Sequence, residues 1–185
     1  MTRHGPARSV ARVLRLAATL LLLSTLAACG GQVGHAGSLS YEFDHPREWQ
    51  RLDVDLPNAA AVTTDTVGLD GRNWVSVSSE GLAEALTADQ VAAAPRDLRA
   101  RLTRELAAVR ISLVDAPRTT RFAGLAGLEY TIAFEDEDGT PLHSRIVTLF
   151  SEREAFSIGC QSSRPNAQQI ADGCSQVLAT LEVQT

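Results

Sequence analysis

Residues 127–150 read GLEYTIAFEDEDGTPLHSRIVTLF, and this stretch decides the fold. Apolar side chains alternate with other residues from Leu128 to Phe134, which is the two-residue period of a half-buried strand. A second strand is predicted to run through Ile146 to Phe150. Between the two strands, Asp138-Gly139 is a strong hairpin signal. The stretch therefore predicts a pair of antiparallel strands.

The same alternation predicts further strands on both sides of this hairpin. They are expected at Leu39–Phe43, Leu52–Leu56, Val75–Val77, from Ile111 toward Phe122, and at Phe156–Cys160, with an earlier hairpin at Asp70-Gly71.

Two segments have helical spacing instead. Leu98, Leu102, Leu106 and Val109 share one face of the first helix, while Arg96, Arg99, Arg101 and Arg104 lie on its remaining surface. Thr87 to Gln90 is typical of a capping box, and Pro95 is expected to kink or divide the helix. A second helix follows Pro165, with inward positions Ile170, Cys174, Val177, Leu178 and Leu181. Together these elements predict an α+β domain, an antiparallel sheet of about five to seven strands flanked by two main helices.

Cys160 and Cys174 are predicted to form a disulfide. Cys160 has the parity of Phe156 and Ile158, and Cys174 lies on the apolar stripe of the last helix, so both point toward one strand–helix interface. In an oxidising compartment such a pair is expected to be bonded. A structural role is favoured over a redox-active one, because reactive pairs usually sit close together at a helix start with an exposed thiol.

The first 28 residues indicate an export signal. A basic stretch is followed by a short apolar run from Leu16 to Leu26, too short for the roughly 20 residues of a spanning helix. Leu26-Ala27-Ala28-Cys29 then resembles the lipobox of bacterial lipoproteins. In that family the cysteine receives a diacylglyceryl group, its freed amine can carry an acyl chain such as palmitate, and it becomes the first mature residue. The resemblance implies a lipid anchor at Cys29 on the outer face of the cell membrane, after export by the general secretory route. An ordinary signal peptide with a spare cysteine is the alternative.

The organisation that follows is a signal peptide over 1–28, a lipidated cysteine with a Gly-rich tether over 29–38, and one domain over 39–185. The net charge is −5, and the signal holds four of the basic residues, so the mature part is still more acidic. Such a charge disfavours nucleic acid as a partner. Lysine is absent from the chain, which excludes a Schiff-base lysine and a P-loop.

The order of these features resembles the LpqN/LpqT-type lipoproteins of the actinomycete cell envelope, within a wider PsbP-like superfamily. The resemblance rests on the lipobox and tether, on YEFDHPREW with Pro46 and Trp49, on GLAGLEYTIAF with Gly127 and Tyr130, and on the final cysteine pair. It implies a PsbP-like antiparallel sheet with flanking helices. It also implies an accessory or binding protein without a conserved catalytic set.

No metal, cofactor or catalytic site is predicted. The acidic run Glu135 to Asp138 lacks the spaced ligands of a calcium loop and is expected to form a solvated hairpin tip. His45 and His143 are far apart, and the common hydrolase and nucleotide motifs are missing. A hidden hydrolase would need one of these His residues near a Ser and an acid.

Trp49 and Trp74 are the candidate surface for a partner or ligand. Trp49 is expected mainly in the core, with one wall of a groove as the alternative. Trp74 has the opposite parity to Val75 and Val77, so it either covers the second face of the sheet or is exposed.

The sequence favours a non-catalytic, membrane-anchored interaction protein with an envelope or host protein as its partner. The alternative is a lipid or small-molecule binding module with an apolar cavity between sheet and helices.

Overall fold

The computed structural model describes residues 41–53, 63–151 and 154–183, so Cys29, Leu39, Val54 and Leu56 lie outside the described residues. The elements in chain order are β1 (Tyr41–Glu42), β2 (Gln50–Arg51), β3 (Thr63–Asp70), β4 (Asn73–Gly81), α2 (Ala88–Ala108), β5 (Ser112–Phe122), β6 (Leu125–Glu135), β7 (Pro141–Phe150), β8 (Glu154–Ser163), the 3-10 helix η1 (Arg164–Asn166), α3 (Ala167–Thr180) and β9 (Glu182–Val183). Within this part, no helix is both long and apolar enough to cross a membrane.

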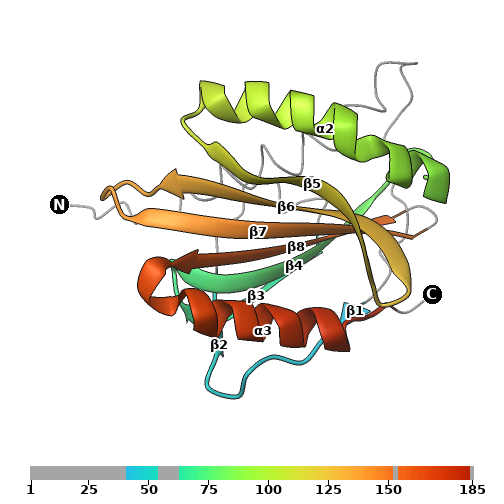
Figure 1. Cartoon of the computed structure of the whole chain (residues 1–185). Helices are drawn as coiled ribbons and strands as arrows, with labels where there is room; N and C mark the ends of the chain where they lie inside the picture. Colours follow the sequence, from blue (N-terminus) through green and yellow to red (C-terminus); the bar gives the residue numbers. More distant parts are fainter. Residues whose placement is uncertain (1–40, 54–62, 152–153, 184–185) are drawn as a thin grey trace.

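Seven strands form one antiparallel sheet in the order β2-β3-β4-β8-β7-β6-β5, and β1 pairs with β9 beside it. The predicted hairpins at Asp70-Gly71 and Asp138-Gly139 connect β3 to β4 and β6 to β7. Gly139 has φ 79°, the left-handed conformation that this kind of tight turn favours. The predicted α+β architecture is therefore confirmed, and α2 and α3 are its two main helices (Figure 1).

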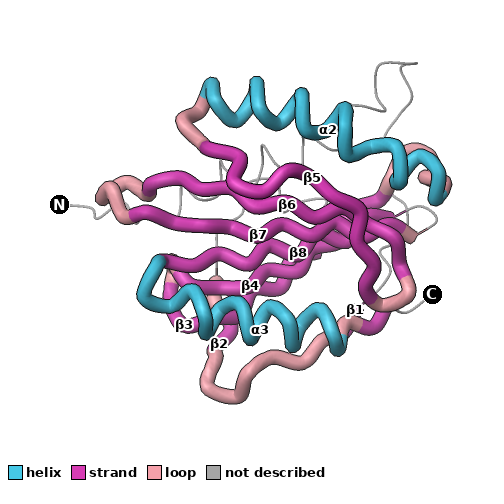
Figure 2. The backbone as a smooth tube through the Cα atoms, viewed as in Figure 1, coloured by secondary structure: helices cyan, strands magenta, loops and turns pink. Residues whose placement is uncertain are grey.

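Each face of the sheet packs against one helix. The face that we call the α2 face carries Leu128, Tyr130, Ile132 and Phe134 of β6, packed with Leu98, Leu102 and Leu106 of α2. The α3 face carries Val75, Val77, Phe156 and Ile158, packed with Ile170, Val177 and Leu178 of α3. Figure 2 shows the strands lying between the two helices, with the loop 43–49 passing beside α3. The alternation of each strand thus divides its side chains between two cores.

The first helix forms with its predicted cap and differs from its prediction at Val109. Its capping box is present, since Gln90 N donates to Thr87 Oγ1 at 3.3 Å and Thr87 N donates to Gln90 Oε1 at 2.7 Å. Pro95 does not divide α2, which continues through it to Ala108. Val109 was expected on the buried face, but it is the C-cap, with non-helical φ and ψ, and its side chain is 44% exposed.

Candidate functional site

A cavity of about 360 Å³ lies between α2 and the sheet. Its walls come from the first half of α2, the segment 82–86, and the ends of β4, β6, β7 and β8. We call it the α2 cavity. Its apolar lining is formed chiefly by Leu82, Leu86, Val91, Leu98, Leu128 and Phe150. A mostly apolar cavity of this size falls within the usual range for small-molecule sites.

A row of hydroxyl groups crosses three neighbouring strands at the floor of this cavity. Ser157 of β8 lies opposite Ser78 of β4 and opposite Thr148 of β7, so the three residues share one row of the α2 face. Ser157 and Thr148 both line the cavity. The Thr148 side chain is buried, and its Oγ1 has no hydrogen-bond partner among the described residues. Since a buried hydroxyl normally has a partner, Thr148 is available to a polar atom of a ligand.

Acidic side chains dominate the charges on the cavity wall. Among the described residues, Glu80, Glu84 and Asp97 line it together with one cation, Arg101. Arg101 Nε donates to Glu105 at 3.0 Å, so its charge is already paired. Glu80 is half-buried at the end of β4, and burial raises the pKa of its carboxyl above the ordinary value.

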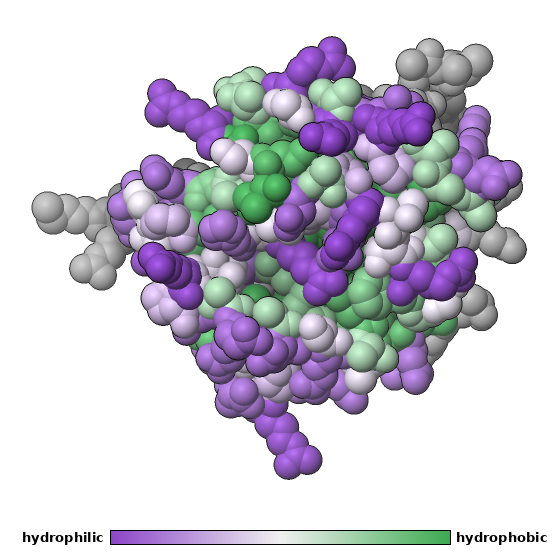
Figure 3. All heavy atoms as spheres, in the orientation of Figure 1, coloured by the Kyte–Doolittle hydropathy of each residue, from purple (hydrophilic) through white to green (hydrophobic). Residues whose placement is uncertain are grey.

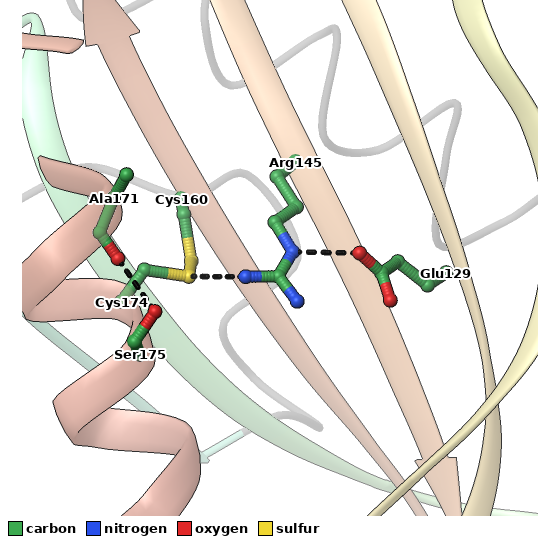
Figure 4. Close-up of a disulfide and its surroundings, with 6 residues drawn as sticks. All are labelled: Glu129, Arg145, Cys160, Ala171, Cys174 and Ser175. Carbon is green, nitrogen blue, oxygen red and sulfur yellow. Dashed lines mark hydrogen bonds and ion pairs between the residues drawn. A yellow bond between two sulfur atoms is a disulfide. The ribbon is translucent and has the colours of Figure 1, made fainter. Parts of the chain in front are cut away.

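The predicted disulfide between Cys160 and Cys174 is confirmed and lies under α3. Its S–S distance is 2.02 Å, and both residues belong to the core of the α3 face. Figure 4 shows Arg145 between the disulfide and Glu129, with Arg145 Nη1 3.9 Å from Cys174 Sγ. Its burial and its place between strand and helix support a structural role.

Glu129 is the centre of an ion-pair cluster on the same face of the sheet. Arg145 Nε donates to its Oε1 at 2.8 Å, and Arg118 Nη2 donates to the same atom at 3.1 Å. Burial by itself would raise the pKa of Glu129, but the hydrogen bonds and charges of both arginines outweigh it and lower the pKa. Figure 3 shows hydrophilic residues gathered on the strands between the two helices on this side. Apart from the parity of Glu129, no feature of the sequence pointed directly to this cluster.

Neither candidate tryptophan forms an exposed surface. Trp74 lies on the α2 face with Ser76 and Ser78 and is 1% exposed, so it covers the second face of the sheet and the alternative of an exposed ring is wrong. Trp49 is buried in the core of the α3 face against Gly173. Neither residue lines the α2 cavity. The cavity itself comes from residues that the sequence pattern did not single out as a site.

The acidic run and the two histidines do not converge on a reaction centre. Asp136 Oδ1 accepts hydrogen bonds from the backbone N–H groups of Asp138 and Thr140, and its Oδ2 accepts one from Arg72. His143 is exposed on β7, while the Nδ1 atom of His45 lies 2.9 Å from the carbonyl oxygen of Pro46. Among the described residues, no hydrogen bond joins either histidine to a Ser or an acid, and no group of three His, Cys, Asp or Glu side chains could hold a metal ion.

No protein-family model and no curated protein matches this chain in sequence. Solved structures do resemble it. A protein of Bacteroides thetaiotaomicron aligns at 14% identity and a TM-score of 0.48 over 78% of this chain, which spans only 45% of that protein.

Two further structures are similar over most of both chains. LpqN, which is involved in cell envelope biogenesis of Mycobacterium tuberculosis, is 11% identical with a TM-score of 0.52, over 80% of this chain and 86% of its own. CyanoP, the cyanobacterial PsbP of Synechocystis sp. PCC 6803, is 16% identical with a TM-score of 0.51, over 86% and 99%. At these identities the likeness concerns the fold, and this chain has a PsbP-like α+β fold.

Proposed function

We propose that this chain is a cell-envelope lipoprotein of the LpqN/LpqT type, an accessory protein without catalytic activity whose domain binds an apolar small molecule or lipid in the α2 cavity. The cavity carries the proposal. Its volume of about 360 Å³ and its apolar walls are what a binding module requires, and the Thr148 hydroxyl offers a hydrogen bond within it.

The anchor and the envelope location are part of the same proposal. The lipobox-like segment ending at Cys29 and the Gly-rich stretch after it support a tethered domain at the outer face of the cell membrane. The role of LpqN in envelope biogenesis agrees with this location.

Native mass spectrometry tests the binding function. The mature chain without its anchor cysteine, Gly30 to Thr185, is exported from an actinomycete host and purified without detergent. It is expected to carry a reproducible apolar ligand that denaturation releases. A matched pair of variants locates it: Ala94→Trp fills the cavity wall, while Ala100→Trp places the same ring on the exposed side of α2. We expect the ligand to persist in Ala100→Trp and to be lost in Ala94→Trp. Bare wild-type protein that also fails to bind added octanol would contradict the proposal.

The anchor has an independent test. Replacing Cys29 by Ala is expected to abolish incorporation of labelled palmitate and to block lipoprotein processing in the native type of host. Unchanged labelling in Cys29→Ala would place the acylation elsewhere.

A protein-interaction role is the second candidate. The observation that favours it is the pair of exposed apolar residues next to the α2–β5 turn, Val109 and Val114, which are 44% and 51% exposed. A pull-down from envelope extract with wild type and Val114→Ser tests it. The same partner recovered with both proteins, or no reproducible partner, would count against this surface.

A further inference from the structure

We propose that the α2 cavity selects an apolar molecule that carries a protonated amine, with the Glu80 carboxylate as its counter-ion. This inference rests on the proposed binding function and names the chemical class of the ligand. It follows from the charge of the cavity wall, from the environment of Glu80, and from the place of Glu80 beside the hydroxyl row.

The wall has a negative charge balance. Among the described residues that line the cavity, Glu80, Glu84 and Asp97 are acidic and Arg101 is the one basic residue, already paired with Glu105 at 3.0 Å. An anionic head group would meet uncompensated carboxylates, whereas a cation would be attracted by all three.

Of the three carboxylates on the wall, Glu80 would gain most from a bound cation. It is half-buried, and no hydrogen bond or ion pair to it is found among the described residues. Burial disfavours its charged form and raises its pKa. Glu84 and Asp97 are exposed and solvated, so they gain less from an added cation. A ligand ammonium beside Glu80 would offset its desolvation.

The position of Glu80 also brings it beside the hydroxyl row. Glu80 lies opposite Ala155 of β8, and Ser157 is two residues further along that strand on the same face. Diagonal neighbours of this kind are about 7–8 Å apart at their backbones, within reach of a long side chain. Ser157 in turn lies opposite Thr148. An ammonium group has three N–H donors, and it could satisfy the Glu80 carboxylate while donating to an adjacent hydroxyl oxygen.

A carboxylate ligand at the start of α2 is the rival occupant. The first-turn N–H of Gln90 already donates to Thr87, and the Gln90 side chain accepts from the Thr87 N–H. The capping box therefore satisfies donors that an anion would use, and the acids on the wall oppose it.

Isothermal titration calorimetry with three probes of equal chain length separates these classes. Octylamine, octanol and octanoate are titrated at pH 7 into the mature chain, which contains every described element and both cores. We expect octylamine to bind about tenfold more tightly than octanol, with octanoate weakest. Glu80→Gln is expected to reduce this preference to within about twofold. Glu137→Gln, which removes the same charge from the exposed β6–β7 turn, is the matched control and is expected to behave as wild type.

The outcomes distinguish this inference from the proposed function. Failure of all three probes to bind would overturn both. Octanol binding without a preference for octylamine, or a preference that survives in Glu80→Gln, would overturn the amine assignment and leave the binding function standing. Tighter binding of octanoate would establish the rival class.

Discussion

The indole ring of Trp49 lies directly against the backbone of Gly173, so that a methyl group added at Gly173 would overlap the six-membered part of the ring. The two residues are far apart in sequence and join the loop before β2 to the middle of α3. Glycine inside a helix costs about 1 kcal/mol relative to alanine. Here that cost is offset by the burial of a tryptophan in the core of the α3 face.

Gly173→Ala is therefore expected to destabilise the protein, although alanine is the better helix former. Overpacking a core in this way costs about 1–3 kcal/mol. In a Trp49→Phe background the overlapping ring atoms are gone, and Gly173→Ala is expected to stabilise by up to about 1 kcal/mol. Urea unfolding of the four proteins in this double-mutant cycle measures the coupling, and equal effects of Gly173→Ala in both backgrounds would contradict the contact.

Removal of the disulfide is expected to cost about 3 kcal/mol. Cys160 and Cys174 are separated by 14 residues, and closing a loop of that length restricts the unfolded chain by this amount in the chain-entropy account. The double variant Cys160→Ala/Cys174→Ala and the reduced wild type are compared with the oxidised wild type by urea unfolding. A loss below about 1 kcal/mol in both would show that the bond contributes little.

Glu129→Gln is expected to destabilise by about 1–3 kcal/mol at neutral pH, because Arg145 loses its charged partner. The Glu129 side chain is 9% exposed and that of Arg145 is 31% exposed, so solvent replaces the partner poorly. The pKa of Glu129 is lowered on folding, so this contribution is present above the ordinary value of 4.5 and is lost as pH falls through the lower folded value. Chemical unfolding between pH 2 and 7 checks the trend, with Glu137→Gln as the control. If the difference in the free energy of unfolding between wild type and Glu129→Gln did not change with pH, this prediction would be wrong.

Whereas Glu129→Gln is expected to destabilise the protein at neutral pH, Glu80→Gln is expected to stabilise it. Burial raises the pKa of Glu80, so its charged form opposes folding, and stability is lost as pH rises from the ordinary value of 4.5 through the raised one. The charged residues that line the cavity with Glu80 among the described residues, Glu84, Asp97 and Arg101, are present in both wild type and Glu80→Gln. We expect Glu80→Gln to have the higher Tm at pH 7 and the same Tm as wild type near pH 3. A lower Tm at pH 7 would show that Glu80 has a stabilising partner in the folded chain.

Thr148→Val is expected to weaken ligand binding without destabilising the fold. Valine has the same shape and removes a buried hydroxyl that lacks a partner, so stability is expected to be unchanged or higher by up to about 1 kcal/mol. Octanol affinity should fall about threefold or more if the hydroxyl meets the ligand. Thr119→Val, on the exposed part of β5, is the control for strand propensity. Unchanged octanol affinity in Thr148→Val would exclude the hydroxyl from the site.

The sequence by itself determined the buried face of several strands and of most of both helices. Alternation placed Leu128, Tyr130, Ile132 and Phe134 on one side, and they pack together on the α2 face. Parity and helical spacing brought Cys160 and Cys174 to one interface, where they are bonded. The hairpins and the Thr87 cap were equally predictable, because each depends on residues within a few positions of one another.

Only the tertiary structure decided which elements lie side by side. Periodicity encodes the face of a strand but not its neighbour, so the pairing of β4 with β8, and with it the row Ser78–Ser157–Thr148, could not be read from the sequence. The same limit hid the contact of Trp49 with Gly173 and left the position of Trp74 open. The α2 cavity is the clearest case: it exists because the side chains of α2 and of four strand ends do not fill the space between them, and that depends on distances between elements remote in sequence.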